Sequence, residues 1–338
     1  MSEKAKKFNN QLLNEYLLKW KDLPTRTLAT KIYKENPTVF KDQEQVRSLL
    51  RIRKGTNGLI SRRQAGSKTY FSKDALSKLT LENIEEGIDE REVDFIFPNN
   101  VKNTLVISDC HIPYHNKAAL IQAINYGKKE NIDSILINGD WIDFAPCSEY
   151  TKDPYTKLRM RQDIEEATAY LFILRNTFPN AHIYFKHGNH EDWLEKYLMN
   201  KAPVLLDMLE FKLSYLLKFQ ELRIIEISSY QLMKYGKLSI IHGHELKQIL
   251  RSVNPARTLY LKTKISTLVA HHHVTSEHTE SDLESNITTC FSMGCLSQLK
   301  PRYAGLDSKY NHGFVHLKKE TNGTYHISNK RIINGIIY

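Results

Sequence analysis

Five short clusters of acidic, amide and imidazole residues lie between residues 109 and 273. They are Asp109-Cys110-His111, Gly139–Asp143, Gly188–Glu191, His242-Gly243-His244 and Ala270–His273. Each follows a run of apolar residues of the length expected for a short buried strand. In open α/β sheets, ligands bind at the carboxyl ends of the strands, so polar residues placed there converge. We therefore expect all five clusters to meet at one site.

The residue types in these clusters are those of a metal centre. Two divalent cations about 3.5–4 Å apart need one carboxylate that bridges them and imidazoles that complete each shell. Carboxylate, amide oxygen and imidazole ligands suit Mn, Fe, Zn or Ni better than thiolate-seeking metals. Asp109 and His111 are expected to project to one side of an extended strand end, because side chains alternate with a period of two, and so are His271 and His273. The glycines beside Asp140 and Asn189, which begin two of the clusters, are expected to permit tight turns.

The order of the motifs carries a family resemblance. DxH, GDxxD, GNH[DE], a His before Gly and a final HxH follow one another over residues 109–273. This order resembles the calcineurin-like metallophosphoesterase family, and the resemblance covers residues from about 100 to 338. It implies two divalent metal ions, with Mn as the first expectation, and shells that share Asp140. The implied ligands are Asp109, His111, Asp140 and His273 for one ion, and Asp140, Asn189, His242 and His271 for the other.

The same resemblance implies roles around the metals. His190 is expected to face the substrate phosphate as general acid or transition-state stabiliser, oriented by Asp143 or Glu191. The expected reaction is in-line attack on phosphorus by a hydroxide that the metals activate, without a covalent intermediate. His242 is the better candidate ligand of its cluster, whereas His244 is a candidate contact of the phosphate.

Two departures from the family pattern bear on the function. The last motif has Ala270 in place of glycine and an additional His272, so the ligand assignment there depends on register. Protein Ser/Thr phosphatases of the family carry an arginine directly after GDxxD, and this chain has Phe144. We therefore predict a phosphodiesterase or nuclease that acts on nucleic acid or a nucleotide. A phosphomonoesterase, and a nucleic-acid-binding protein that uses the fold as a scaffold, are the alternatives.

The elements that would position this site alternate between strands and helices. Strands are predicted over residues 104–109, 134–140 and 182–189, and helices over 116–131 and 156–178. Further short strand-like segments follow, which predicts a second sheet. The expected fold is an α/β four-layer α/β/β/α sandwich of two mixed sheets flanked by helices, preceded by a small, mainly α-helical domain. The predicted domains are 1–73, an acidic linker 74–98 and the phosphoesterase domain 99–338.

The basic excess of the chain lies at its N-terminus. Residues 1–73 contain 17 Lys and Arg against 6 Asp and Glu, whereas residues 74–94 contain 2 against 8. Helices predicted over 11–23, 23–36, with Thr25 as N-cap, and 42–55 favour a helix-turn-helix-like module, although a basic solvated face on a packing module is the simpler alternative. Salt-sensitive phosphate contacts are expected from basic residues of this module. The candidates are Arg47, Arg51, Arg53, Arg62 and Arg63.

Composition limits the remaining possibilities. The chain has 338 residues and a formal charge of +10, which mildly favours a polyanionic partner. The sequence has no apolar stretch long enough for a membrane span and no visible export signal, so we expect no membrane partner. Its four cysteines show no pairing pattern, which is typical of reduced thiols and favours a cytoplasmic location. The oligomeric state stays open.

Overall fold

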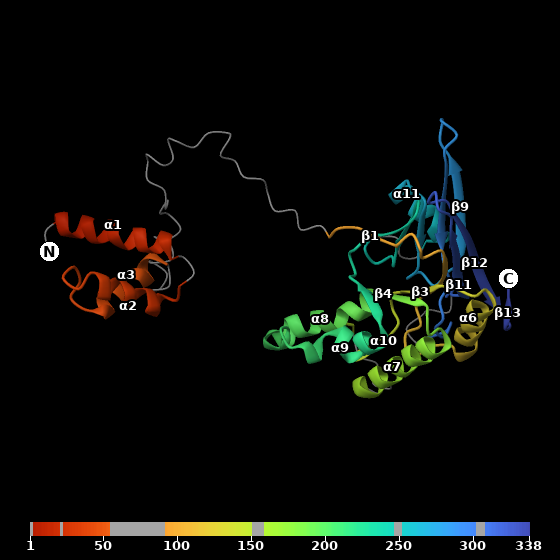
Figure 1. The fold of residues 1–338 in the computed structure, drawn as a ribbon, viewed down its shortest axis with the longest axis horizontal. Helices are drawn as coiled ribbons and strands as arrows, with labels where there is room; N and C mark the ends of the chain where they lie inside the picture. The colour runs from red at the N-terminus through yellow and green to blue at the C-terminus, as the bar shows by residue number, and fades with distance from the viewer. Residues whose placement is uncertain (1–2, 21–22, 55–91, 151–158, 247–251, 302–307) are drawn as a thin grey trace. The chain divides into compact units, whose positions relative to one another are not determined.

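The computed structural model describes residues 3–20, 23–54, 92–150, 159–246, 252–301 and 308–338. The chain forms two compact units, residues 1–89 and 90–338. Each is described by itself below, and Figure 1 shows the elements of both. Arg62 and Arg63, which we predicted to bind phosphate, lie outside the described residues.

The described part of the first unit contains three helices around a core of its own. The helices are α1 (Glu3–Lys19), α2 (Thr25–Glu35) and α3 (Gln43–Arg53). Leu13, Leu28, Ile32 and Leu50 are fully buried against one another. This small core shows that the apolar residues at helical spacing face inward.

Capping residues define where two of these helices begin. The Asp42 side chain accepts a hydrogen bond from the Gln45 backbone nitrogen (2.7 Å), as expected for the acidic N-cap of α3. Helix α2 begins at Thr25 itself, and Pro24 occupies the capping position. The N-cap of this helix was therefore predicted one residue too late, at Thr25 instead of Pro24.

The structure changes the predicted basic face of α3. Arg53 is buried, and its guanidinium donates to Asn14 Oδ1 (3.3 Å) and to the Leu49 carbonyl (3.1 Å). Residues 51 and 53 lie on different sides of a helix with 3.6 residues per turn, so Arg53 does not share the exposed side of Arg51, and its phosphate contact stays a prediction. Arg47 is more exposed and pairs with Glu44 at 3.1 Å.

The second unit is built on two sheets. The first has seven strands in the order β13-β12-β11-β2-β3-β4-β5, and its four strands β2 to β5 are parallel. Their bounds are β2 (Asn103–Ile107), β3 (Ser134–Asn138), β4 (His182–Lys186), β5 (Ile224–Ile227), β11 (His312–Lys319), β12 (Tyr325–Ile333) and β13 (Ile336–Ile337).

The other sheet has six strands in the order β1-β6-β7-β8-β10-β9 and is mixed. Its first strand, β1, pairs with β6, so residues that we predicted to belong to the linker begin the second unit instead. The bounds are β1 (Phe95–Ile96), β6 (Met233–Tyr235), β7 (Leu238–Ile241), β8 (Thr267–Val269), β9 (Ser276–Ser281) and β10 (Ile287–Ser292).

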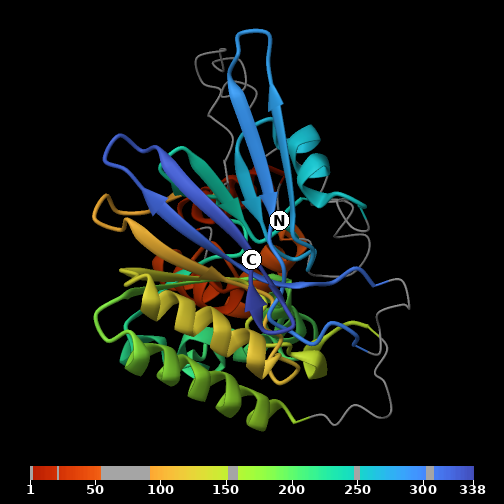
Figure 2. The same ribbon diagram turned by 90° about the vertical axis from the view of Figure 1, so that its right-hand side faces the viewer.

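Helices cover the outer faces of both sheets, which completes a four-layer sandwich (Figures 1 and 2). An apolar layer with Val106, Leu136, Ile240 and Val315 fills the space between the sheets. The predicted fold class is confirmed. The helices are α6 (Lys117–Lys129), α7 (Met160–Thr177), α8 (Asn189–Lys201), α9 (Leu213–Leu216), α10 (Phe219–Leu222) and α11 (Pro255–Thr263), with short 3₁₀ turns η2 (Ala145–Cys147), η3 (Pro203–Leu205) and η4 (Leu209–Phe211).

Two further findings concern composition. None of the described helices combines the length and the apolar character that crossing a bilayer would require. The four cysteines, Cys110, Cys147, Cys290 and Cys295, are buried thiols in the described part of the chain.

A buried arginine holds the outer helical layer to the parallel sheet. Arg175, near the end of α7, donates hydrogen bonds to the carbonyls of Leu222, Phe178 and Ala181, among others. Burial lowers the pKa of this guanidinium, and Arg223 adds to the shift. Each of these hydrogen bonds contributes little by itself. Their loss would be costly, because it would leave several buried carbonyls without a donor.

We expect Arg175→Met to lower the free energy of unfolding of the second unit by about 3 kcal/mol, because several buried carbonyls would lose their donor. The matched control is Arg161→Met, since Arg161 lies exposed on the same helix. Urea unfolding followed by circular dichroism measures both. Equal stability of the two variants would contradict this role of Arg175.

Candidate metal centre

The candidate ligands lie on loops just beyond the strands. Strand β2 ends at Ile107 and β8 at Val269, so Asp109, His111, His271 and His273 are outside the ladders. All four have left-handed backbone, with φ between 49° and 61°. The prediction that these residues continue extended strands is therefore wrong. The Asp109–His111 and His271–His273 pairs nevertheless both contribute to the same centre. Such left-handed conformations cost about 1–2 kcal/mol per non-glycine residue and are concentrated at functional sites.

Among the described residues, three groups of ligand-type side chains form at this edge of the sheets. Two of them consist of candidate ligands alone, and the third joins His111 to Asp143 and His190. Asp109, His111 and His273 make one group. Nε2 of His273 lies 3.2 Å from Asp109 Oδ1 and 3.2 Å from His111 Nε2. Two imidazole nitrogens that share one cation at about 2.1 Å lie roughly 3 Å apart, so this spacing fits a common metal ion.

The second group comprises Asp140, His242 and His271. Oδ2 of Asp140 lies 3.2 Å from His242 Nε2 and 3.7 Å from His111 Nε2, which belongs to the first group. Asp140 is thus the carboxylate between the two groups. Its Oδ1 accepts a hydrogen bond from the His190 backbone nitrogen (3.0 Å), which fixes the carboxylate on the first turn of α8.

Hydrogen bonds select which ring nitrogen faces the site. His242 Nδ1 lies 2.6 Å from the Asn138 carbonyl oxygen, so this nitrogen carries the proton and donates it. His111 Nδ1 lies 3.0 Å from Asp143 Oδ1. A donor role for each Nδ1 leaves the Nε2 lone pair directed at the site, which is the tautomer that a metal ligand needs.

Unsatisfied atoms test whether the residues fit a metal. Among the described residues, Asp109 Oδ1, Asn189 Oδ1 and His242 Nε2 are buried without a hydrogen-bond partner. Buried polar atoms in native proteins are almost always paired, so an exception needs a reason. Here all three belong to the predicted ligand set and have lone pairs suited to a cation. The donor set therefore fits divalent metal ions.

Charge and burial explain the protonation preferences of the cluster. Burial lowers the pKa of His111 and, more strongly, that of His271, so both favour the neutral form that binds a metal. Burial acts in the same direction on His242, but the Asp140 carboxylate overcomes it and raises the pKa of His242 to about 10. A cation bound to Asp140 would compete with that proton.

Close backbone contacts place the central carboxylate. Gly188 lies so near Asp140 that any side chain at this position would collide with the carboxylate and its backbone nitrogen. Gly139 has a φ of 86°, and a side chain there would meet the His242 ring. The two glycines are needed for turn geometry and for this close approach.

Two buried carboxylates hold the ligand loops by their backbone. Glu191 accepts from the backbone nitrogens of Asp140, Trp141, Ile142 and Gly188 at 2.8–3.2 Å. Its carboxylate is thus committed to four backbone N–H groups, three in the loop that carries Asp140 and one at Gly188, just before α8. The predicted part of Glu191 in orienting His190 has no support in these contacts, since its oxygens bind the loop instead.

Glu245 plays the equivalent part at the other loop. It accepts from the His242 (3.1 Å) and Gly243 (2.6 Å) backbone nitrogens, and its Oε1 lies 3.2 Å from the fully buried ammonium of Lys186. Sequence reasoning missed Glu245 and Lys186. The signal was present, because Glu245 follows His242 by three residues just as Glu191 follows Gly188.

His190 is held beside the metal ligands. Its Nδ1 lies 2.8 Å from the Asp143 carbonyl oxygen and 3.2 Å from Asp143 Oδ1, and its Nε2 lies 3.9 Å from Asp140 Oδ2. Burial opposes protonation of His190, but the carboxylates of Asp140 and Asp143 raise its pKa to about 9. Trp193 covers the ring, with centroids 3.8 Å apart. Asp143 is therefore the orienting group of His190.

The other candidate histidines differ in their surroundings. His244 lies between Asp192 (3.6 Å) and Glu245 (3.5 Å), whose charges disfavour a nearby phosphate, and its phosphate contact stays a prediction. His272 is in none of the three groups of ligand-type side chains, and burial lowers its pKa to about 4. His187 pairs with Glu226 at 2.8 Å, away from the ligand groups.

Phe144 fills the position after GDxxD with a buried ring. It is 1% exposed, has a φ of 47° and packs in the core beneath the helices. Within the described part of the chain, the recorded polar contacts of the ligand side chains involve imidazoles, carboxylates and backbone groups, with no Lys or Arg.

The model of the calcineurin-like phosphoesterase family matches residues 102–299, which is more than half of the chain and contains every candidate ligand. The chain belongs to this family. With its metal site, it is a metal-dependent phosphoester hydrolase. The Gene 54 protein of Mycobacterium phage D29 is 26% identical over 178 residues, which are 51% of this chain and 69% of that protein. The corresponding protein of Mycobacterium phage L5 is 25% identical over the same length.

The chain is also similar, at low identity, to several solved structures. Vacuolar protein sorting 29 from Cryptosporidium parvum is 13% identical, with a TM-score of 0.38 over 70% of this chain and 94% of that one. The nuclease MPE from Pseudomonas putida is 10% identical, with a TM-score of 0.29 over 67% and 87%. At these values neither structure informs the substrate.

Neighbouring histidines allow a direct test of the ligand assignment. We expect His271→Ala to lower the metal content of the purified protein by about one ion per chain, because His271 completes the group with Asp140 and His242. His272→Ala, one residue further on, should keep the full content. Elemental analysis after chelation and reloading with Mn²⁺ measures both. An equal loss in the two variants would refute the assignment.

Proposed function

We propose that the chain is a phosphodiesterase with two metal ions, and that its substrate is nucleic acid or a nucleotide. The observation that supports a diester is the charge of the site. A phosphomonoester carries close to two negative charges at neutral pH and a diester carries one. With Phe144 buried where phosphatases of the family have arginine, this site has less positive charge to offer a dianion.

The residues divide the work of such a reaction. Asp109, His111, Asp140 and His273 would hold one ion, and Asp140, Asn189, His242 and His271 the other. Bound divalent ions supply Lewis-acid stabilisation of the phosphoryl oxygens and lower the pKa of water. Mn²⁺ suits this oxygen and imidazole set, as do Fe, Zn and Ni.

His190 is the proposed general acid. Asp143 engages its Nδ1, which leaves Nε2 directed toward the ligand groups and toward any phosphate bound between them. From there Nε2 can transfer a proton to the departing oxygen. Trp193 and Asp143 restrict rotation of the ring, so the geometry is set before the substrate binds.

We expect the protein to hydrolyse bis(p-nitrophenyl) phosphate with Mn²⁺, faster than p-nitrophenyl phosphate, and to lose this activity on chelation. His190→Ala should lower kcat by about 10²–10⁴-fold while metal content is unchanged. His187→Ala is the matched control, because His187 follows the end of β4 and pairs with Glu226 instead. Full activity of His190→Ala would overturn the assigned role, and a clear preference for the monoester would favour the phosphatase alternative.

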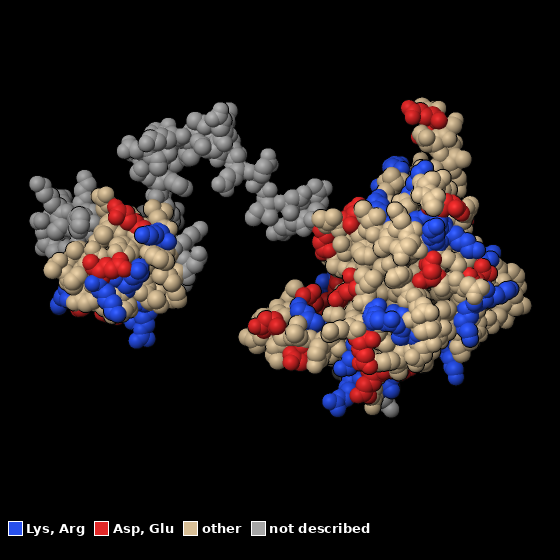
Figure 3. Space-filling model, in the orientation of Figure 1, with Lys and Arg blue, Asp and Glu red and all other residues tan. Residues whose placement is uncertain are grey.

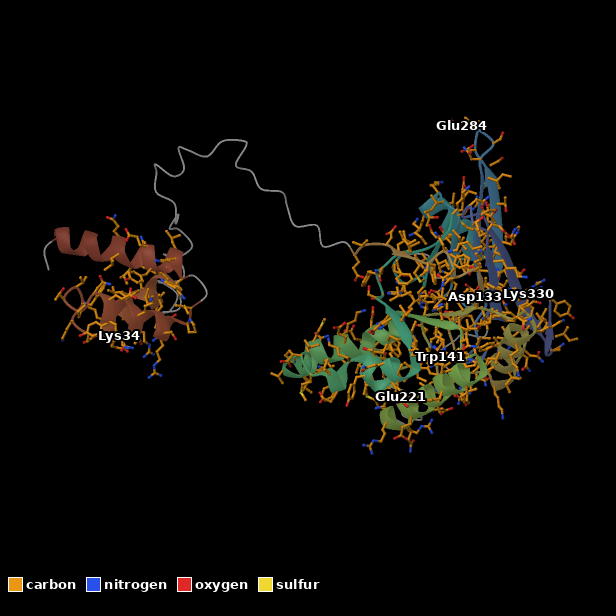
Figure 4. All side chains as sticks on the ribbon, in the orientation of Figure 1. Lys34, Asp133, Trp141, Glu221, Glu284 and Lys330 are labelled. Atoms are coloured by element: carbon orange, nitrogen blue, oxygen red, sulfur yellow. The ribbon has the colours of Figure 1, made fainter. Side chains whose placement is uncertain are left out.

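The first unit is a proposed nucleic-acid contact. Arg26, Lys31 and Lys34 recur on one side of α2, where Arg26 and Lys34 are exposed and Lys31 pairs with Glu35 at 2.7 Å. Figure 3 shows Lys and Arg atoms on the face of this unit where Figure 4 labels Lys34. This basic side of α2 adds to the predicted basic residues of α3, among which Arg53 is buried.

We expect the double variant Arg26→Glu, Lys34→Glu to bind duplex DNA about tenfold more weakly at 50 mM salt, with a shallower salt dependence, because phosphate contacts are lost. The charge-matched control is Lys128→Glu, Lys129→Glu on α6, where both lysines are exposed. Electrophoretic mobility shifts across a salt series measure the affinities. If both double variants weaken binding equally, the basic side of α2 is not the contact.

A further inference from the structure

Aromatic side chains lie against the outer histidines of the metal centre. Trp193 stacks on His190, with centroids 3.8 Å apart and planes inclined by 35°. Tyr310 lies against His273 at 4.5 Å. On another side, Tyr230 meets the His244 ring edge-on at 5.7 Å. These rings come from α8, from the segment before β11 and from the turn after β5.

The histidines connect two of these aromatic residues through a row of ring contacts. From Trp193 the row passes to His190, then to His111 at 4.4 Å, and to His273 at a further 5.1 Å. Tyr310 ends the row. His111 and His273 are candidate ligands of one metal ion. Trp193 and Tyr310 therefore stand at the two ends of the row of imidazoles where a phosphate would bind.

The aromatic residues keep surface that the protein does not cover. Tyr150, which meets Trp193 edge-on at 6.0 Å, is 75% exposed, and Tyr230 is 64% exposed. Trp193 and Tyr310 are half-buried. Trp193 also packs against the core beneath the helices, but core packing does not explain the largely exposed rings of Tyr150 and Tyr230. A ligand with flat rings of its own would cover this surface.

Nucleobases have that shape, and stacking on an aromatic side chain stabilises binding by about 1–3 kcal/mol per base. Bases in a duplex already stack on one another, and exposing their faces costs unstacking. Bases in a single strand have faces available on both sides of each phosphate. Two aromatic positions at opposite ends of the metal centre thus match consecutive bases of a single strand.

We propose that Tyr150, Trp193, Tyr230 and Tyr310 form a base-stacking rim that selects single-stranded nucleic acid and seats the bases on both sides of the scissile phosphate. The inference rests on the proposed diesterase function and narrows its substrate class. Tyr150 and Trp193 would bind the base next to the leaving oxygen, because His190 lies beside them. Tyr310 and Tyr230 would bind bases on the opposite side of the phosphate.

The test uses the full chain, loaded with metal, in a background that silences the first unit. Arg26→Glu and Lys34→Glu remove its proposed phosphate contacts, and Trp20→Phe removes its tryptophan. Trp141, labelled in Figure 4, is fully buried, so quenching of the remaining fluorescence by a nucleotide reports on Trp193. We expect thymidine tetranucleotide to quench this fluorescence.

Affinity for the fluorescently labelled tetranucleotide is then measured by anisotropy in the same background. Trp193→Leu and Tyr310→Leu should each weaken binding about tenfold or more, because each removes a stacking surface. Tenfold corresponds to about 1.4 kcal/mol. Tyr215→Leu is the control, since Tyr215 is an exposed aromatic residue on α9 that contacts Lys218 instead. A hairpin duplex of equal charge should bind more weakly than the single strand, and a ribonucleotide arm tests whether the sugar matters.

Unchanged affinity in both rim variants, or a duplex that binds as well as the single strand, would overturn the rim. Hydrolysis of bis(p-nitrophenyl) phosphate by the parent protein is followed in parallel. If the parent hydrolyses the diester and the rim variants bind normally, only the rim proposal fails. If the parent hydrolyses no diester, the proposed function fails, and the binding measurements still decide whether the rim holds bases.

Discussion

The structure depends on a cluster of electron-pair donors that are unfavourable together without a cation. Asp140 Oδ2 lies within 4 Å of His242, His111 and His190, and the facing Nε2 atoms of His111 and His273 are 3.2 Å apart. Lone pairs and carboxylates packed this closely in a dry site repel one another unless protons or metal ions lie between them. Much of the surrounding chain is arranged to hold these donors in place. The left-handed backbone of the ligand residues adds conformational strain, which the rest of the fold must offset.

The supporting residues act on backbone more than on side chains. Glu191 and Glu245 each bind the amides of a ligand loop, and Lys186 offsets the charge of Glu245 inside the protein. Gly188 lets the chain pass close to the Asp140 carboxylate. Because these residues fix loops, a change in any of them would move several ligands together. The precision of the site therefore comes from parts of the chain that have no direct role in chemistry.

The sequence was sufficient to predict the architecture and the convergence of the clusters. Strand periodicity and the position of polar residues after apolar runs carry that information. Strands β2, β3 and β4 lie where these rules expect, although they end at residues 107, 138 and 186, before the predicted ends at 109, 140 and 189. The left-handed conformations of Asp109 and His111 could not be predicted, because they depend on tertiary contacts with the neighbouring loops. The burial of Arg53 could not be predicted for a related reason. Its charge suggested a surface, whereas a pairing with Asn14, 39 residues away, stabilises it inside the first unit.

The central claim is that Asp140 lies between two divalent ions. Crystals grown with Mn²⁺ and measured on both sides of the manganese absorption edge test it most directly. The account predicts two anomalous peaks about 3.5–4 Å apart, one beside His111 and His273 and the other beside His242 and His271. A single peak, or peaks that do not flank the Asp140 carboxylate, would contradict it.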